Sequence, residues 1–368
     1  MAHEGPVRFA VVGLGHIAQA AVLPAFANAE YCQLAALVTD DFEKVPPIKE
    51  QYDVDQAVHY DDYDRLMASG DVDAVYIALP NSLHCEYAER AAAHGVSVLC
   101  EKPMAITEDE CKRMITAAER TGAKLMLAYR LHFDEANLHA IELARSGRLG
   151  DVRVFNSTFS INVAPGNVRV QPELGGGTLY DIGIYCINAA RYLFRDEPLE
   201  VVAASFNTGD PRFEGVDETT SAVLRFPGDR VAAFTSTFGG EGVDEYRLIG
   251  TQGSLRMEPA YTYIGDRHHF VSVDRETTQR TFPPRDQFAP LLVELARAIR
   301  EDRPPHPGGL EGLADVRIIE AIYRSAIERR PIQIPATCPP QRPELSQAMR
   351  RPPVDEPELI GVESPEGD

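Results

Sequence analysis

Two separated segments of the chain carry side chains that suit proton transfer. The first is Cys100-Glu101-Lys102-Pro103, and the second, much later in the chain, is Asp181-Ile182-Gly183-Ile184-Tyr185. Together they supply an ammonium group, a carboxylate and a phenol. These groups suit the movement of a proton to or from a hydroxyl group, provided that a hydride acceptor binds beside them.

Lys102 directly follows an apolar run, Val96–Cys100, that we predict to be a buried strand. Open α/β sheets bind ligands at the carboxyl ends of their strands. Pro103 restricts the turn that follows the strand. We therefore expect the Lys102 ammonium to face a ligand; the alternative is an ordinary solvated lysine.

Asp181 and Tyr185 are four residues apart on a predicted helix, so both side chains project from the same face. The run Gly175-Gly176-Gly177 precedes them, either to let the helix start approach a ligand or simply as a loop. Taken alone, Tyr185 fits a core aromatic better than a reactive group, and Asp181 fits a helix cap better. The spacing by itself predicts only a shared face.

A nucleotide site is predicted at the N-terminus. The strand Val7–Val12 runs into Gly13-Leu14-Gly15-His16-Ile17-Ala18, a G-x-G-x-x-A turn that opens a helix. The glycines make the tight turn and admit a pyrophosphate close to backbone N–H groups at the positive end of that helix. The strand before it and the helix after it are the context that this motif requires.

Asp40, at the end of the next predicted strand, lies near the distance expected for the residue that binds the ribose diol of a dinucleotide. A carboxylate there accepts hydrogen bonds from a free 2′-hydroxyl and repels a 2′-phosphate, which favours NAD. Thr39 and Lys44 are suited to hold a phosphate instead. The sequence therefore favours NAD and leaves NADP open.

Alternating strands and helices in the first third predict a doubly wound parallel sheet. The predicted strands are Val7–Val12, Leu34–Val38, Ala74–Leu79, Val96–Cys100 and Lys124–Ala128. From Asp151 longer alternating strands predict an α+β second domain with a large, open, mainly antiparallel sheet. We expect a Rossmann domain over residues 1–130, a substrate and oligomerisation domain over 131–335, and a flexible Pro/Glu-rich tail over 336–368.

Composition narrows the classes of partner. The net charge is -20 and 44% of the residues are hydrophobic, which fits a globular protein and disfavours nucleic acids and anionic membranes. No apolar run reaches the length of a membrane span, and no signal peptide is apparent at the start, so we expect a cytoplasmic protein. The six cysteines lack disulfide or zinc spacing, and no metal is expected.

These motifs together resemble the Gfo/Idh/MocA oxidoreductases, and within them the glucose-fructose oxidoreductase-like branch. The resemblance runs from about Val7 to Pro335. It includes the glycine turn, Pro80-Asn81-Ser82-Leu83-His84, Glu101-Lys102-Pro103, Tyr129-Arg130-Leu131-His132-Phe133, Gly175-Gly176-Gly177, Asp181 to Tyr185 with Asn188, and Arg191-Tyr192-Leu193. Tyr185 stands where many members have His, as in that branch.

The resemblance implies that Lys102, Asp181 and Tyr185 line the substrate pocket, and that Arg169 reaches the cofactor from the second domain. The residues that we expect to bind the cofactor are Gly13, Gly15, His16, Ile17, Thr39, Asp40, Lys44, Leu79, Pro80, Asn81, His84, Glu101, Lys102, Arg130 and Arg169. Those that we expect to bind the substrate are Lys102, Arg130, Asp181, Tyr185 and Tyr263.

The activity that follows from this resemblance is hydride transfer between a free aldose, such as glucose or xylose, and NAD or NADP. Lys102 and Tyr185 would take part in proton transfer. The alternatives are a ketosugar, inositol or nucleotide-sugar dehydrogenase or reductase, and a non-catalytic NAD(P)-binding regulator. The resemblance also implies a homodimer or homotetramer.

Overall fold

The structure, a computed structural model, describes residues 5–337, 341–355, 357–362 and 364. The chain forms two compact units. The first comprises Met1–Arg130, Arg285–Gly312 and Arg351–Ser364, and the second includes Leu131–Pro284 and Leu313–Arg350. Two later segments therefore return to the first unit, an arrangement that the expected division into consecutive domains did not include.

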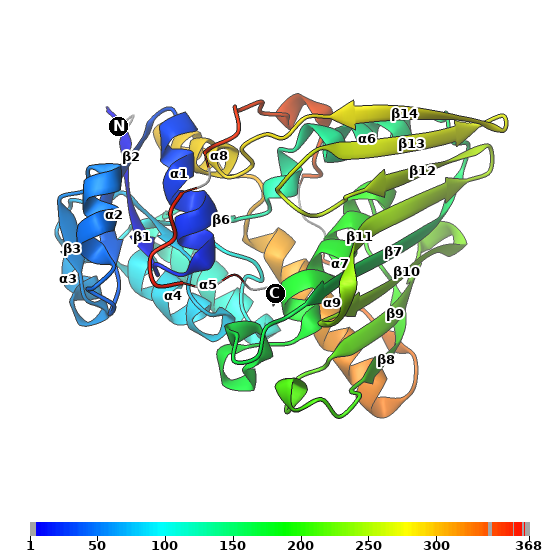
Figure 1. Cartoon of the computed structure of the whole chain (residues 1–368), viewed down its shortest axis with the longest axis horizontal. Coiled ribbons are helices and arrows are strands. Elements are labelled where there is room, and N and C mark those ends of the chain that lie inside the picture. Colours follow the sequence, from blue (N-terminus) through cyan, green and yellow to red (C-terminus); the bar gives the residue numbers. More distant parts are fainter. Residues whose placement is uncertain (1–4, 338–340, 356, 363, 365–368) are drawn as a thin grey trace. The chain divides into compact units, whose positions relative to one another are not determined.

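A six-stranded parallel sheet forms the centre of the first unit (Figure 1), with strand order β3-β2-β1-β4-β5-β6. The strands are β1 (Val7–Val12), β2 (Cys32–Val38), β3 (Gln56–Val58), β4 (Ala74–Ile77), β5 (Ser97–Cys100) and β6 (Leu125–Leu127). All residues of β4 and β5 are buried, which explains why both read as unbroken apolar runs. The doubly wound sheet predicted from the sequence is confirmed.

The helices of the first unit follow its strands in alternation. They are a π-helical turn over Ala18–Val22 continuing into α1 (Leu23–Ala25), then α2 (Val45–Tyr52), α3 (Tyr63–Ala68), α4 (His84–Ala93), α5 (Glu108–Thr121) and α8 (Ala289–Arg300). Helix α5 shows why such a segment is helical: Thr107 and Glu110 form a capping box at its start, and Gly122 ends it in the left-handed conformation.

The second unit is built on a nine-stranded sheet of order β14-β13-β12-β11-β7-β10-β9-β8-β15. The strands are β7 (Val152–Asn162), β8 (Glu200–Phe206), β9 (Thr219–Phe226), β10 (Arg230–Thr237), β11 (Gly239–Gly250), β12 (Gly253–Glu258), β13 (Arg267–Val273), β14 (Glu276–Phe282) and β15 (Ile332–Gln333). All neighbours are antiparallel except β7 and β10. The expected large, mainly antiparallel sheet is confirmed.

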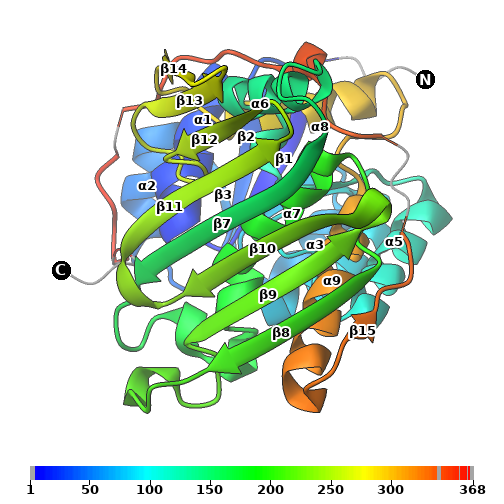
Figure 2. The same cartoon turned by 90° about the vertical axis from the view of Figure 1, so that its right-hand side faces the viewer.

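One face of this sheet is covered and the other is open. Figure 2 shows β7 to β11 in front, with α7 (Ile184–Phe194) and α9 (Gly309–Glu328) behind them. Helix α6 (Glu135–Arg145) also belongs to the second unit, and a π-helical turn over Leu179–Gly183 precedes α7. Alternate residues of β9 and β10 are buried, as expected for strands with one packed face.

The segment expected to be a flexible tail makes specific contacts where it is described. A short 3-10 turn covers Leu345–Gln347, and Arg350 forms an ion pair with Glu135 at 2.8 Å. Further on, Arg351–Ser364 joins the first unit. Composition alone did not reveal these contacts; Cys338, Pro339 and Pro340 lie outside the described residues.

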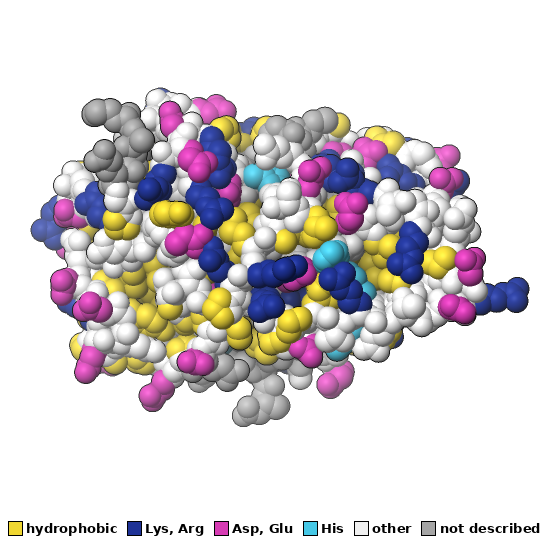
Figure 3. Space-filling view, turned by 90° about the horizontal axis from the view of Figure 1, so that it is seen from above, with side chains coloured by type: hydrophobic (Ala, Val, Ile, Leu, Met, Phe, Trp, Pro, Cys, Tyr) yellow, Lys and Arg dark blue, Asp and Glu magenta, His cyan; other side chains and the backbone are white. Residues whose placement is uncertain are grey.

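Charged side chains alternate in sign on the face shown in Figure 3. Arginines pair with nearby carboxylates, as Arg297 does with Glu30 at 2.9 Å within the first unit. Over the described ranges no helix has the length and hydrophobicity needed to cross a membrane. Among the same residues no three His, Cys, Asp or Glu side chains gather as metal ligands would.

Candidate functional site

The glycine turn after β1 has the geometry that a dinucleotide requires. Gly13 has a φ of 92°, and a Cβ there would lie 2.6 Å from the Ala78 carbonyl oxygen, so no other residue fits. Gly15 is exposed, and a Cβ on it would meet nothing within 4 Å. His16 and Ile17 are half-buried and begin the helix. The turn therefore presents its backbone to open space at a helix start, where a pyrophosphate binds.

The loop after β2 carries both candidates for cofactor selection. Asp40 is exposed, and Thr39 is buried with its hydroxyl accepting a hydrogen bond from the Asp41 N–H at 3.0 Å. The Lys44 ammonium lies 2.9 Å from the Asp41 carboxylate. A carboxylate for the ribose diol and an ammonium suited to a phosphate therefore occupy one loop.

His84 connects the two loops at the carboxyl ends of β4 and β5. Its ring is fully buried, with Nδ1 2.8 Å from the Pro103 carbonyl oxygen and Nε2 2.9 Å from that of Leu79. Burial lowers the pKa of His84 in spite of these contacts. The His84 ring thus links the loop after β4 to the loop that carries Lys102, and its expected place along the cofactor stays a prediction.

Glu101 fixes the backbone of Lys102. It is buried, and its carboxylate accepts hydrogen bonds from the Tyr76 hydroxyl at 2.6 Å and from the Lys102 N–H at 3.2 Å. Burial raises the pKa of Glu101. Lys102 itself is half-buried, at the carboxyl end of β5 as predicted.

Three further residues that we expect to contact the cofactor differ in their exposure. Pro80 and Asn81 are half-buried in the loop that follows β4, where Asn81 begins a 3-10 turn. Arg130 is only 5% exposed and donates a hydrogen bond to the Gln287 side chain. The sequence gave no indication of this partner, because Gln287 is 157 positions away.

In the second unit, Arg169 and Asp181 form a close ion pair. The Arg169 Nε donates to Asp181 Oδ2 at 2.6 Å, and the two side chains are 27% and 16% exposed. Burial alone would lower the pKa of Arg169, but Asp181, Tyr185 and Tyr263 raise it above its usual value. Asp181, Tyr185 and Tyr263 therefore all interact electrostatically with the Arg169 guanidinium.

The glycine run holds the loop that carries Arg169. The Gly177 N–H donates to the Arg169 carbonyl oxygen at 2.9 Å, and a Cβ on Gly176 would lie 2.5 Å from the same oxygen. Asn167 accepts a hydrogen bond from the Arg169 N–H at 3.1 Å. The glycine run therefore packs its backbone closely against the Arg169 loop, which neither of the two predicted uses included.

Tyr185 lies in an aromatic cluster with its ring half-buried. Its ring centroid is 5.7 Å from that of Phe159 and 5.8 Å from that of Tyr261. The Tyr261 hydroxyl is bonded in turn to the Ser157 hydroxyl at 2.7 Å. Packed rings on one side restrict the Tyr185 side chain to a narrow range of positions.

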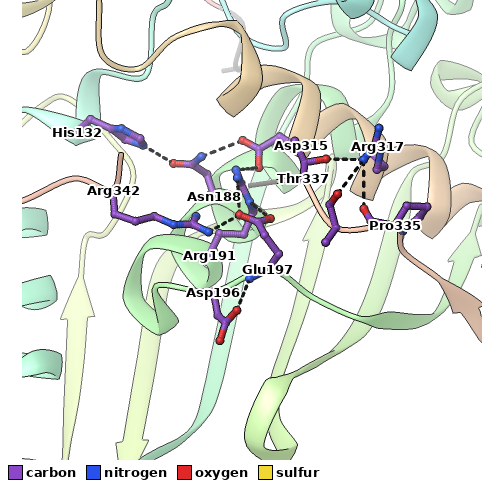
Figure 4. Close-up of polar contacts among 11 residues, drawn as sticks. His132, Asn188, Arg191, Asp196, Glu197, Asp315, Arg317, Pro335, Thr337 and Arg342 are labelled. Atoms are coloured by element: carbon purple, nitrogen blue, oxygen red, sulfur yellow. Dashed lines mark hydrogen bonds and ion pairs between the residues drawn. The ribbon is translucent and has the colours of Figure 1, made fainter. Parts of the chain in front are cut away.

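A buried polar network lies beneath α7 (Figure 4). Asn188 contacts His132 Nε2 through its Oδ1 at 2.9 Å and donates from its Nδ2 to Asp315 at 2.8 Å. Arg191 is fully buried and donates to Asp315 at 2.6 Å and to Glu197 through two bonds at 2.8 and 2.9 Å. Such a network fixes α7, whose first turn carries Tyr185 and which directly follows the π-helical turn that carries Asp181.

The structure thus groups Asp181, Tyr185, Tyr263 and Arg169 within the second unit, while Lys102 belongs to the first. The sequence analysis missed the Arg169–Asp181 pair. The only local signal for it was the glycine run between the two residues.

Two family models match the chain. One, described as an oxidoreductase family with an NAD-binding Rossmann fold, matches residues 7–129. The other, the GFO/IDH/MocA C-terminal domain, matches residues 137–256. Together they span both units.

Three characterised proteins are similar over most of their length. The aldose-aldose oxidoreductase of Caulobacter crescentus, solved with glycerol, has 39% identity and a TM-score of 0.85, with 89% of this chain and 100% of that chain covered. An NADP-dependent D-xylose 1-dehydrogenase of Haloarcula marismortui is 31% identical, with coverage of 88% and 92%. A dTDP-3,4-didehydro-2,6-dideoxy-alpha-D-glucose 3-reductase of Streptomyces violaceoruber is 32% identical, with coverage of 80% and 85%.

Proposed function

Because the chain belongs to the Gfo/Idh/MocA oxidoreductase family, we propose that it oxidises the CH–OH group of a free aldose. It is an NAD(P)-dependent oxidoreductase with a Rossmann domain. The observation that carries the choice of substrate is the group formed by Asp181, Arg169 and Tyr185: a fixed carboxylate, suited to a sugar hydroxyl, beside a phenol. The names of the C. crescentus and H. marismortui relatives, both acting on aldoses, support it.

The proposed reaction assigns one role to each side chain. Tyr185 takes the proton of the sugar hydroxyl, and Lys102 stabilises the oxygen anion that develops as this proton leaves. When bound, the nicotinamide would accept the hydride from the sugar carbon that carries this hydroxyl. Asp181, held by Arg169, accepts a hydrogen bond from a neighbouring hydroxyl and orients the sugar.

Positive charge beside the reacting hydroxyl favours the proposed proton transfer, because it stabilises the negative charge that develops on oxygen. Arg169, which interacts electrostatically with Tyr185, supplies one such charge, and Lys102 supplies the second in the proposed arrangement.

Cofactor choice rests on the loop after β2. Asp40 favours NAD, whereas Lys44 and the NADP dependence in the name of the H. marismortui relative favour NADP. We propose that Asp40 and Lys44 together set the ratio of kcat/KM with NAD to kcat/KM with NADP. An Asp40→Ala variant should shift the ratio of kcat/KM toward NADP, and Lys44→Ala should shift it toward NAD.

The test of the activity is an absorbance assay at the reduced-nicotinamide band. NAD and NADP are offered separately with a panel of pentoses and hexoses, and we expect reduction with at least one aldose. If no sugar or polyol is oxidised and no dTDP-linked ketosugar is reduced although NAD(P)H binds, the protein is a cofactor-binding regulator instead.

A nucleotide-sugar reductase is the second candidate, supported by the S. violaceoruber relative. Such an enzyme would reduce a nucleotide-linked ketosugar, whereas the first candidate oxidises a free aldose. Oxidation of NADPH with a dTDP-linked ketosugar, without oxidation of any free aldose, would establish this alternative.

We propose further that a second copy of the chain covers the open face of the nine-stranded sheet. On this face Val202 and Val223 are directly paired across β8 and β9 and are 48% and 47% exposed, and Phe206 is 60% exposed. Contiguous exposed apolar side chains of this kind mark interaction surfaces. Val223→Glu should reduce the mass measured by light scattering to that of a monomer; Glu241→Gln, away from this apolar group, is the control. A wild-type chain that is monomeric at all concentrations would contradict the proposal.

A further inference from the structure

The C-terminal segment Leu359–Val362 lies against the first unit beside the nucleotide turn. The Ile360 N–H donates to Gln19 Oε1 at 2.8 Å, and Gln19 Nε2 donates to the Ile360 carbonyl oxygen at 3.0 Å. This reciprocal pair satisfies both backbone groups of Ile360, as a neighbouring strand would. Figure 1 shows the segment, in red, beside α1.

Gln19 links this segment to the turn itself. Its side chain is almost completely buried, and the same Nε2 donates to the Leu14 carbonyl oxygen at 2.8 Å. Leu14 stands between the two glycines of the turn. Movement of the segment is therefore coupled through one side chain to the backbone that would bind the pyrophosphate.

The segment also confines Lys44 in the loop after β2. Gly361 has a φ of 60°, and a Cβ on it would lie 3.0 Å from Lys44 Cε. The Lys44 side chain is only 16% exposed, with its ammonium held 2.9 Å from Asp41. Leu359–Val362 thus contacts both pieces of chain that border the adenosine ribose of a dinucleotide in this fold.

The beginning of this C-terminal stretch is fixed to the same unit. Asn28 Nδ2 donates to the Pro352 carbonyl oxygen at 3.0 Å and to the Asp286 carboxylate at 3.0 Å. Arg351 forms an ion pair with Glu30. A short tether from this anchor gives Leu359–Val362 a high effective concentration at the nucleotide turn.

We propose that Leu359–Val362 is a nucleotide-binding element that forms one wall of the site on the side of the adenosine ribose and slows release of the nucleotide. The proposal rests on the proposed function, because it requires a dinucleotide at the glycine turn. Two hydrogen bonds and the packing on Lys44 hold the wall, so its loss should weaken nucleotide binding by about tenfold, mostly through faster release.

The test measures binding of NADH and NADPH to the full-length protein by the fluorescence of the reduced nicotinamide. Release rates come from stopped-flow displacement by an excess of the oxidised nucleotide. One variant ends after Val354, which keeps the anchor and removes the wall. The other, Ile360→Pro, keeps the full length of the chain but removes the N–H that donates to Gln19 and restricts the backbone at this position. Ile360→Val and Glu358→Ala, the latter exposed, serve as controls.

We expect both altered proteins to release nucleotide about ten times faster while the two controls match the wild type. Unchanged affinity and release in both variants would overturn the proposal, and so would tighter binding, which would show that the segment obstructs the site. The measurement on the wild-type chain distinguishes failure of the proposed function from failure of the proposed wall. A wild-type chain that binds neither nucleotide contradicts the proposed function itself, whereas binding that is insensitive to both changes contradicts only the wall.

Discussion

Replacement of Arg169 distinguishes two roles for this side chain. The family resemblance places Arg169 at the cofactor, whereas its contact in the second unit is with Asp181 at 2.6 Å. If its main role is to hold Asp181, then Arg169→Gln should impair sugar oxidation and leave nucleotide affinity nearly unchanged.

The size of the effect follows from the geometry of the pair. Hydrogen bonds to charged groups contribute about 1.5–3 kcal/mol. The side chains are 27% and 16% exposed, so solvent screening favours the lower part of that range. A loss of about 1.5–2 kcal/mol corresponds to roughly a ten- to thirtyfold lower kcat/KM for the sugar.

The assay compares kcat/KM for the best aldose with the Kd of NADPH measured by fluorescence. Arg169→Lys keeps the charge but loses the directed Nε donor, and should fall between the wild type and Arg169→Gln. Arg153→Gln, on an exposed arginine of the same unit, is the matched control. A variant that loses nucleotide affinity but keeps kcat/KM at saturating nucleotide would refute the positioning role and favour the cofactor contact.

Three further outcomes are expected. Tyr185→Phe should lower turnover by about a hundred- to ten-thousandfold with little change in nucleotide affinity; near wild-type turnover would remove Tyr185 from the mechanism. Gly13→Ala should abolish nucleotide binding, because its Cβ would lie 2.6 Å from the Ala78 carbonyl oxygen; retained binding, measured by fluorescence, would contradict the close fit of this turn. Burial lowers the pKa of His269 from 6.5 to about 4, so the unfolded chain binds more protons between these values and stability should fall by about 3 kcal/mol as the pH drops from 6.5 to 4. Denaturant unfolding of His269→Gln should show a smaller loss over the same range, and an equal loss would rule this histidine out as the cause.

The elements that the sequence predicted well are those with purely local signals. Strand β1 begins and ends at the predicted residues, and β4 differs from its prediction by two residues at one end. Both strands are almost completely buried and therefore read as largely apolar runs. Gly13 marks the end of β1, whereas the apolar Ala78-Leu79 follows β4 and extended the predicted strand. The glycine turn was predictable because its glycines follow one another directly between a strand and a helix, although the contact that requires Gly13 is with Ala78, after β4.

Contacts between residues far apart in the chain left no such signal. Asn188 and Asp315 are 127 positions apart, and Gln19 and Ile360 are 341 positions apart. The Pro- and Glu-rich composition after Pro335 predicts flexibility because few apolar side chains are available to bury. Hydrogen bonds and ion pairs such as Arg350–Glu135 and Arg351–Glu30 fix this segment instead, and composition does not reveal them.

The contacts within the candidate site could likewise be predicted from the sequence only in part. The four-residue spacing of Asp181 and Tyr185 predicted a shared face, but not what holds the carboxylate in place. That depends on Arg169, whose loop is packed against Gly176 so closely that a Cβ there would lie 2.5 Å from the Arg169 carbonyl oxygen. Gly176 therefore acts on the carboxylate through Arg169, without itself carrying a reactive group. The glycine run before Asp181 thus matters for the position of its carboxylate, because it fixes the loop of Arg169, and the sequence pattern alone does not distinguish this from an ordinary loop.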